Sequence, residues 1–307
     1  MGIVQSDTKD FYNVSASGSS ESLVWLGPDD PDHESEVLRL EFETKVLAGP
    51  ISPSQSAEIF EDLTNEKRNR NGGVPWWDRI WSKMTKCSTN TRTDYARANY
   101  LNSIFQQRHL IATEAPTADT VCDFFDMIRR EKCRVVVVLG KMFDDESYAY
   151  WSPDLGVKRN GRWVVGTSKK RDMGDFKIYT LMIIDPTSMK KCRTITLFHY
   201  VNWTEHKALV NTDNVFEMMR AICIKEGPRL FLDMRTKRPI VVHCNDDSGR
   251  TGTFCTIFLC LCEFLWFGDT NVLDMVKRLR YGRYTIVKTP EQYVFIFHVL
   301  NTYFFTL

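Results

Sequence analysis

Short β-branched apolar runs and longer amphipathic stretches follow one another along the chain, and each type predicts a different kind of element. The apolar runs have the length of buried strands and lie at residues 134–139, 180–184, 194–200 and 240–243. Helices are predicted at residues 36–47, 54–63, 215–225, 253–267, 271–280 and 291–304, with Ser54 at the N-cap of the second. Strands and helices mixed without strict alternation predict an α/β (α+β) fold, in which a mixed, twisted sheet is flanked by helices.

The beginning of the chain has a different composition, rich in Ser, Asp, Gly and Pro. This composition predicts a mobile polar tail over residues 1–34, followed by one folded domain over residues 35–307. A hydrophobic fraction of 43% with 12% aromatic residues is sufficient for a substantial core.

The most apolar stretch covers residues 254–267 and contains Glu263. A transmembrane helix needs about 20 apolar residues, so this stretch is too short to span a bilayer. We expect it to be a buried helix inside the domain.

Charge and cysteine content narrow the class of protein. The 40 basic side chains nearly balance the 39 acidic ones, so we expect no bulk attraction to nucleic acid or to membranes. Nine cysteines show no paired metal-ligand spacing, and an odd number without a secretory signal is typical of free thiols in a reducing compartment. We therefore expect a cytoplasmic protein that needs no metal and no cofactor.

The N-terminus carries Met1-Gly2 with Ser6, the skeleton of an N-myristoylation signal. One acyl chain binds membranes only marginally without a second signal. Lys9 is the one basic residue among the first 36, so that second signal is missing. We expect peripheral membrane association only if Gly2 is acylated.

Residues 241–252 read Val-Val-His-Cys-Asn-Asp-Asp-Ser-Gly-Arg-Thr-Gly and carry the strongest chemical signal of the chain. A strand that ends at Cys244 and a short loop that enters a helix can aim several backbone N–H groups at one anion. The same field stabilises a thiolate, and Arg250 adds a planar fork that holds two phosphate oxygens. A nucleophile beneath a phosphate cradle predicts phosphoryl transfer to cysteine. The alternative is a buried structural cysteine before an ordinary helix.

This loop resembles the signature of the protein tyrosine phosphatases, which reads His-Cys, five residues, then Arg-Ser/Thr-Gly. Three further segments resemble family motifs in the same order: 94–100, the turn at 111–116 with a helix start at 120–125, and 289–293. The resemblance extends over about residues 50–305 and implies the family's fold.

The resemblance also assigns roles to individual residues. Cys244 is the nucleophile and Arg250 the phosphate clamp, while residues 245–250 (Asn245, Asp246, Asp247, Ser248, Gly249 and Arg250) form the cradle. Thr251 is the hydroxyl that eases departure of the thiolate in the second step. His243 orders the loop from beneath, a role that is compatible with a satisfied core histidine.

Several positions depart from the family pattern. Glu205 is the one candidate general acid where the family has Asp, and the extra methylene displaces its carboxyl by about 1 Å, which can cost on the order of 100-fold in rate. In the phosphotyrosine-recognition loop, Asn71 replaces the stacking aromatic residue, and Trp76 or Trp77 is either a substitute wall or a core residue. Lys288 replaces the glutamine that positions the hydrolytic water before Gln292, and a charged lysine cannot accept a proton.

The cradle itself departs most from the family, because Asp246 and Asp247 stand where the family has small residues. At roughly 7 Å and an effective dielectric near 20, each carboxylate costs a bound anion about 2 kcal/mol before screening by solvent. Nearby basic residues are Lys277, Arg278, Arg280 and Arg283, which either rim the site or form a solvated helix face with one arginine in a structural ion pair. Residues 169–171 (Lys-Lys-Arg) are expected in a polar loop.

Two functional hypotheses follow. The first is a pseudophosphatase that binds phosphotyrosine-containing or related proteins or peptides without efficient turnover. The second is a divergent but active phosphatase that uses Cys244, Arg250 and Glu205. A third and more distant hypothesis is an interaction module whose cleft binds no ligand.

Overall fold

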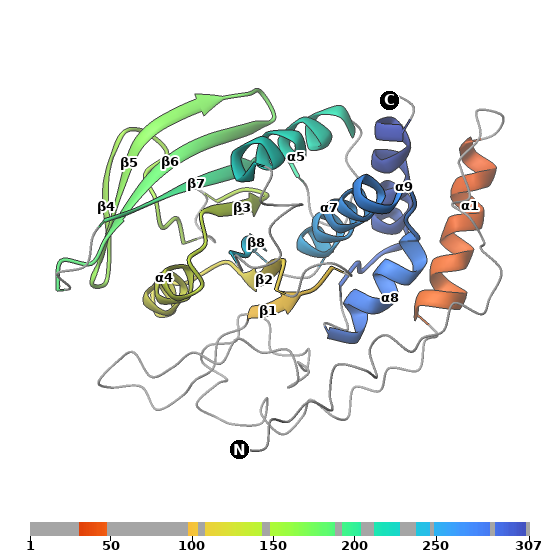
Figure 1. Cartoon of the computed structure of the whole chain (residues 1–307), viewed down its shortest axis with the longest axis horizontal. Helices are drawn as coiled ribbons and strands as arrows, with labels where there is room; N and C mark the ends of the chain where they lie inside the picture. Colours follow the sequence, from red (N-terminus) through yellow and green to blue (C-terminus); the bar gives the residue numbers. More distant parts are fainter. Residues whose placement is uncertain are drawn as a thin grey trace, which may run out of the picture.

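A mixed β-sheet organises the part of the chain that the structure describes (Figure 1). The computed structural model describes residues 31–47, 98–103, 108–142, 148–187, 192–203, 212–227, 238–245, 249–282 and 286–304. These residues form one sheet of eight strands in the order β1-β2-β8-β3-β7-β6-β5-β4. The strands are β1 (Ala98–Leu101), β2 (Leu110–Glu114), β3 (Val135–Leu139), β4 (Gly156–Asn160), β5 (Trp163–Asp172), β6 (Phe176–Ile184), β7 (Arg193–Tyr200) and β8 (Ile240–Cys244).

The centre of the sheet is parallel and positions the candidate site. Strands β2, β8, β3 and β7 run in one direction, and Cys244 is paired with both Glu114 and Leu139, which is in turn paired with Tyr200. All five residues of β3 and all five of β8 are buried, as expected for parallel strands covered on both faces. The carboxyl ends of four strands therefore meet beside Cys244.

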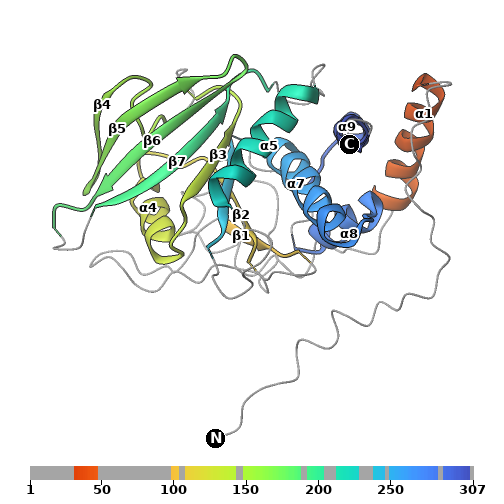
Figure 2. The same cartoon turned by 45° about the horizontal axis from the view of Figure 1, so that its top comes forward.

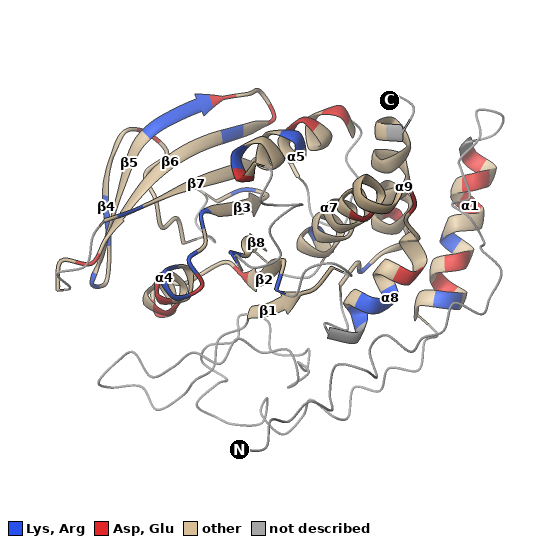
Figure 3. Ribbon diagram, in the orientation of Figure 1, with Lys and Arg blue, Asp and Glu red and all other residues tan. Residues whose placement is uncertain are grey.

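An antiparallel wing extends the sheet on the other side of β7, where β5 and β6 form a long hairpin (Figure 1). The prediction of a polar loop at residues 169–171 was wrong, because Lys169, Lys170 and Arg171 pair with residues of β6. This half of β5 is exposed, so basic side chains are compatible with it, and the Lys170 ammonium pairs with Asp154 at 2.8 Å. In the ribbon of Figure 3, the segment with Lys169, Lys170 and Arg171 is the blue stretch of β5 on this wing.

Helices cover the two faces of the sheet unequally (Figures 1 and 2). Helix α4 (Val121–Arg130) lies on one face, where Phe124 and Phe125 pack with Val136 and Val138 of β3. Alternate residues of β3 face the other layer instead. That layer contains α5 (Thr212–Glu226), α7 (Gly249–Phe267), α8 (Val272–Gly282) and α9 (Pro290–Phe304).

Helix α7 is the predicted buried helix. By length and composition it is the one described helix that could cross a membrane, but 78% of its most apolar stretch is buried inside the protein. Its residues pack against α8, α9 and the sheet, so it is the core helix of the domain.

A helical segment near the N-terminus packs against α9 at the edge of this helical layer. Helix α1 (Pro31–Glu41) begins earlier than the predicted start at residue 36 and continues as a π-helix, η1 (Phe42–Leu47). The ring of Phe42 lies 5.5 Å from that of Tyr293 in α9, and the Tyr293 hydroxyl donates to Glu41 at 2.8 Å. The predicted helix at residues 54–63 lies outside the described residues.

The other predicted elements correspond to β3, β6, β7, β8, α5, α7, α8 and α9, with ends that differ by a few residues. The prediction of a turn at residues 111–116 was wrong. Residues up to Glu114 belong to β2, and only the residues that follow form a loop.

Candidate active site

Cys244 is the last residue of β8 and is completely buried, between β2 and β3. Its carbonyl oxygen accepts a hydrogen bond from the backbone N–H of Ala115 at 3.1 Å, which continues the parallel pairing beyond β2. The next residue, Asn245, donates through Nδ2 to the carbonyl of Lys141 at 3.3 Å. The beginning of the loop is therefore fixed on both sides by the neighbouring strand ends.

The first turn of α7 supplies the second half of the site. Gly249 is the first residue of the helix, and Arg250 and Thr251 follow it. The Thr251 hydroxyl donates to the Cys244 sulfur, with 3.1 Å between Oγ1 and Sγ. A hydrogen bond to sulfur and a helix N-terminus both favour the thiolate over the thiol. The Thr251 hydroxyl therefore lies within hydrogen-bond distance of the Cys244 sulfur, and its role in the departure of the thiolate stays a prediction.

Arg250 is also buried, and its Nη1 donates to the carbonyl oxygen of Trp203 at 3.2 Å. Gly140, the residue after β3, makes this position possible. Its φ is +97°, and a Cβ there would collide with Nη1 of Arg250 and lie 3.0 Å from Cζ. Only glycine combines this backbone conformation with that close approach. Sequence reasoning missed Gly140, whose only local signal is a glycine directly after a buried strand.

His243, the residue before Cys244, is completely buried, and its predicted role in ordering the loop stays a prediction. Its Nε2 is 2.8 Å from the hydroxyl of Tyr150, and its ring packs edge-on against Phe124 at 5.8 Å. Burial raises the pKa of Tyr150 well above its ordinary value, so the phenol stays protonated. Sequence reasoning also missed Tyr150, because it is far from His243 in the chain.

His199 holds the strand that leads to the predicted acid loop. Its Nε2 is 2.8 Å from the carbonyl oxygen of Gly140, and its ring packs edge-on against Trp151. Burial lowers the pKa of His199 to about 4, so the ring is neutral near pH 7. The strand end is therefore connected to Gly140 by a neutral hydrogen bond.

The segment before α9 lies against the start of α7. A Cβ at Gly249 would lie 2.6 Å from Nε2 of Gln292, so the Gln292 side chain is in contact with the beginning of the helix. Its Oε1 accepts a hydrogen bond from the backbone N–H of Lys288 at 2.8 Å. The structure thus brings Gln292 and the backbone of Lys288 to the site.

Gly252 allows this close approach, because a Cβ there would collide with Ile286 and lie 2.6 Å from the backbone nitrogen of Val287. Arg280 holds the same segment from the other side, since its Nη1 donates to the carbonyls of Ile286 at 3.1 Å and Val287 at 3.2 Å. Arg278 instead pairs with the buried carboxylate of Glu263 at 2.7 Å. Of the two alternatives for this helix, the structure agrees with an exposed face that has one arginine, Arg278, in a structural ion pair, whereas Arg280 is buried and supports the segment before α9.

Several predicted site residues lie outside the described residues: Asn71, Glu205, Asp246, Asp247 and Ser248, together with Trp76, Trp77 and Arg283. Their roles stay predictions. The predicted free thiols agree with the structure, in that all eight cysteines of the described residues are free.

Comparison with known proteins agrees with this arrangement. The family model described as protein-tyrosine phosphatase matches residues 65–302. Tyrosine-protein phosphatase non-receptor type 9 of mouse is 30% identical over 246 residues, which cover 77% of this chain and 41% of the relative. Human tyrosine-protein phosphatase non-receptor type 12 is 26% identical over 294 residues, which cover 89% of this chain and 35% of the relative. This chain therefore spans about two-fifths or less of the length of these relatives. A family match over most of the chain, joined to a buried cysteine and arginine at a strand–helix junction, means that the chain belongs to the protein tyrosine phosphatase family.

Proposed function

We propose that this chain is a cytoplasmic pseudophosphatase that binds phosphotyrosine-containing or related proteins and turns them over poorly. Two contacts support binding. The Thr251 hydroxyl donates to the Cys244 sulfur, and the Arg250 guanidinium donates to the Trp203 carbonyl, so both residues that would contact a phosphate are held in place. Both relatives are named as non-receptor enzymes, which supports the cytoplasmic location.

One observation carries the proposal of poor turnover. In the described residues the only glutamine at the edge of the cradle is Gln292, and its Oε1 is directed at the backbone N–H of Lys288 at 2.8 Å. Hydrolysis of a phosphocysteine needs an acceptor that orients a water molecule toward phosphorus. At the family's position for that acceptor this chain has Lys288, whose charged ammonium has no lone pair to offer. The intermediate would therefore form more readily than it is hydrolysed.

In an active enzyme, the first chemical step would use Cys244, Arg250 and Glu205. The Cys244 thiolate attacks phosphorus, the S–P bond forms, the aryl P–O bond breaks, and Glu205 donates a proton to the departing oxygen. Arg250 and the first N–H groups of α7 bind the equatorial oxygens. Asp246 and Asp247 would oppose the same negative charge, which weakens both binding and attack.

The Thr251 hydroxyl favours the alternative, a divergent but active phosphatase. Its hydrogen bond to the Cys244 sulfur, at 3.1 Å, serves a thiolate and its departure, neither of which a binding module needs. This hypothesis predicts multiple turnovers and a phosphocysteine that accumulates only briefly.

Titration with a phosphotyrosine peptide, followed by rapid mixing and acid quench, separates the hypotheses. We expect saturable binding of the peptide and release of phosphate on the order of 100-fold or more slower than in an active family member. A rate near that of active relatives, abolished by Cys244→Ser, would overturn the proposal. If neither binding nor phosphate release is measured, the chain is an interaction module whose cleft binds no ligand.

A further inference from the structure

A cavity lies between α4 and the amino end of β7, on the face of the sheet opposite to the core cluster that contains Cys244. It has a volume of about 150 Å³, and its lining includes Phe125, Arg129, Trp163, Asp185 and Arg193. Arg193 is the first residue of β7, whereas the other end of that strand reaches the Cys244 side. At a rise of about 3.3 Å per residue, the two sites are roughly 20 Å apart.

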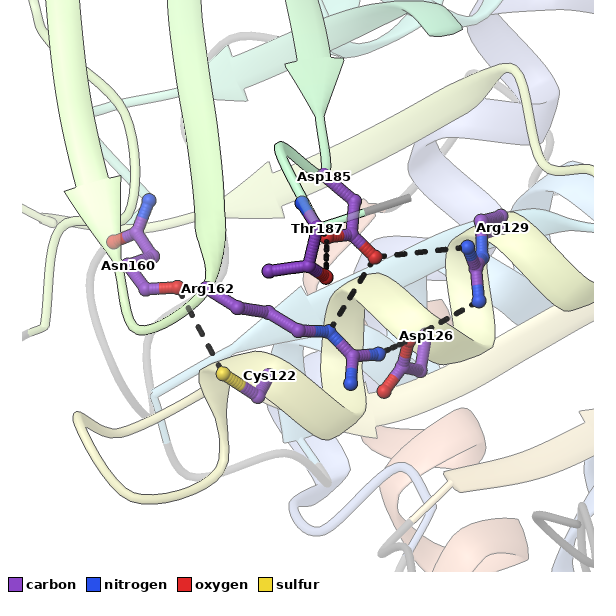
Figure 4. Close-up of polar contacts among 7 residues, drawn as sticks. All are labelled: Cys122, Asp126, Arg129, Asn160, Arg162, Asp185 and Thr187. Carbon is purple, nitrogen blue, oxygen red and sulfur yellow. Dashed lines mark hydrogen bonds and ion pairs between the residues drawn. The ribbon is translucent and has the colours of Figure 1, made fainter. Parts of the chain in front are cut away.

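Two carboxylates and two guanidinium groups form a network on one side of this cavity (Figure 4). Arg162 pairs directly with Asp126 and lies 3.7 Å from Asp185. Arg129 lies farther from the same carboxylates, at 3.9 Å from Asp126 and 3.8 Å from Asp185. Charge-assisted hydrogen bonds are about 2.7–2.9 Å long, so Arg129 is attracted to both carboxylates without donating to either.

Trp163 fixes the direction of these two guanidinium groups. The Cζ atoms of Arg129 and Arg162 lie 5.4 and 5.5 Å from its ring, within the range of cation–π attraction. Asp185 is held separately, because its Oδ1 accepts from the backbone N–H and the hydroxyl of Thr187. Arg129 lines the cavity and lies beyond hydrogen-bond distance of both carboxylates.

Arg193 adds a positive charge that no carboxylate of the described residues balances through an ion pair. Burial, and then the nearby charges of Arg134, Arg238 and Arg129, lower the pKa of Arg193, although the Cys133 thiol acts in the opposite direction. The topology explains why these charges are close together: Arg134 directly precedes β3, and Arg238 lies two residues before the neighbouring parallel strand β8. Nη1 of Arg238 is also buried without a hydrogen-bond partner.

The guanidinium groups of Arg129 and Arg193 are partly buried, and a partly desolvated cation is stabilised by an anion beside it. The lining of the cavity carries two guanidinium groups, those of Arg129 and Arg193, and one carboxylate, that of Asp185, so positive charge is in excess there. A cavity of 150 Å³ is below the usual range of about 300–1,000 Å³ for drug-sized ligands, but it is large enough for one tetrahedral oxyanion. Arginine forks match the oxygen spacing of a phosphoryl group.

We propose that this cavity is a second phosphoryl-binding site, in which Arg129 and Arg193 hold the oxygens of a phosphate. The phosphate is either the free ion or the phosphorylated side chain of a partner protein. This site is independent of the candidate active site and of whether Cys244 carries out catalysis.

Thermal unfolding of the full chain in increasing inorganic phosphate, at constant ionic strength, tests the proposal. The Arg250→Lys background weakens the primary cradle, so that the second site dominates the response. We expect phosphate to raise the melting temperature in this background, and Arg193→Gln to abolish that rise. The matched control is Arg134→Gln, an exposed arginine at the same edge that does not line the cavity, and it should retain most of the rise.

A rise that survives Arg193→Gln, or no rise in the Arg250→Lys background, would overturn the proposal. If the Arg250→Lys variant does not fold, side-chain NMR of wild-type arginine Nε–Hε groups provides the measurement, with phosphate expected to shift the Arg129 and Arg193 signals. Unmoved signals would also refute the site. A phosphoserine peptide that binds more tightly than free phosphate identifies a partner protein as the source, whereas equal affinity identifies the free ion.

Discussion

The Thr251 hydroxyl donates to the Cys244 sulfur at 3.1 Å, and neither side chain is exposed to solvent. The two residues belong to different elements, so the bond joins the end of β8 to the first turn of α7 across the phosphate loop. It is the most direct evidence in the described residues that the cradle is adapted to a thiolate.

Thr251→Val should make Cys244 less reactive, because it removes this bond while keeping the side-chain volume. A hydrogen bond worth about 1 kcal/mol corresponds to roughly a fivefold change in thiolate population. The measurement is the rate of iodoacetamide inactivation against pH, whose midpoint should move to higher pH. Thr256→Val is the matched control, since that buried hydroxyl donates to the Gly252 carbonyl instead. Equal shifts in both variants would contradict the assignment.

Gly140→Ala should disturb the phosphate clamp from a position outside the loop. The new methyl group would collide with the Arg250 guanidinium and be strained at φ +97°, so phosphopeptide affinity should fall at least about tenfold. Gly268→Ala is the control, because its φ is +73° but nothing lies within 4 Å of the added Cβ. Both variants should lose about 1–2 kcal/mol of stability in urea unfolding, but only the first should lose binding. Undiminished phosphopeptide binding by Gly140→Ala would show that the guanidinium can move aside at little cost.

Reversion toward the family pattern should restore turnover in steps. Lys288→Gln supplies a water acceptor and should speed the decay of phosphocysteine, measured by acid quench after a single mixing. Asp246→Ala/Asp247→Gly and Glu205→Asp should instead speed its formation, because they remove negative charge and reposition the acid. A combined variant that gains no phosphate release would mean that the defect lies outside these four positions.

Two buried histidines should make folding stability depend on pH. Burial lowers the pKa of His109 and of His199 to about 4, against about 6.5 in an unfolded chain. The unfolded state therefore binds more protons between these values, and stability should be complete above pH 6.5 and fall as the pH drops toward 4. Urea unfolding across this range measures the slope, which His109→Gln/His199→Gln should flatten. An unchanged slope in the double variant would assign the loss to carboxylates.

A strand could be predicted from the sequence where its side chains are buried. The valines of β3 and β8 are covered on both faces, so their apolar runs are visible in the sequence. Strand β5 was not predicted at all. Its second half contains Lys169 and Lys170 and is exposed, so ladder hydrogen bonds, and not apolar side chains, define the strand there. Residue type alone does not reveal such pairing.

The same distinction applies to the site. Cys244, Arg250 and Thr251 lie in one motif and were predicted together. Gly140 and Tyr150 come from distant segments and reach the site only because β3 and β8 are neighbours and the chain folds back beneath His243. A local pattern cannot contain a steric relationship of this kind, in which a missing Cβ makes room for a guanidinium group 110 positions away.

Arg280 provides a last test, because a rim residue and an internal support respond differently to substitution. Its guanidinium is buried and donates to the carbonyls of Ile286 and Val287, which fix the segment before Lys288. Arg280→Lys keeps the charge but loses the paired donors, so it should still cost about 1–3 kcal/mol of stability and weaken phosphopeptide binding. Lys277→Met, an exposed neighbour on α8, should leave stability nearly unchanged. If Arg280 were a rim residue, Arg280→Lys would change neither stability nor phosphopeptide binding. Any effect of removing the charge would then disappear at high salt. We expect the loss at Arg280 to persist in high salt, since carbonyl hydrogen bonds inside the domain are not screened.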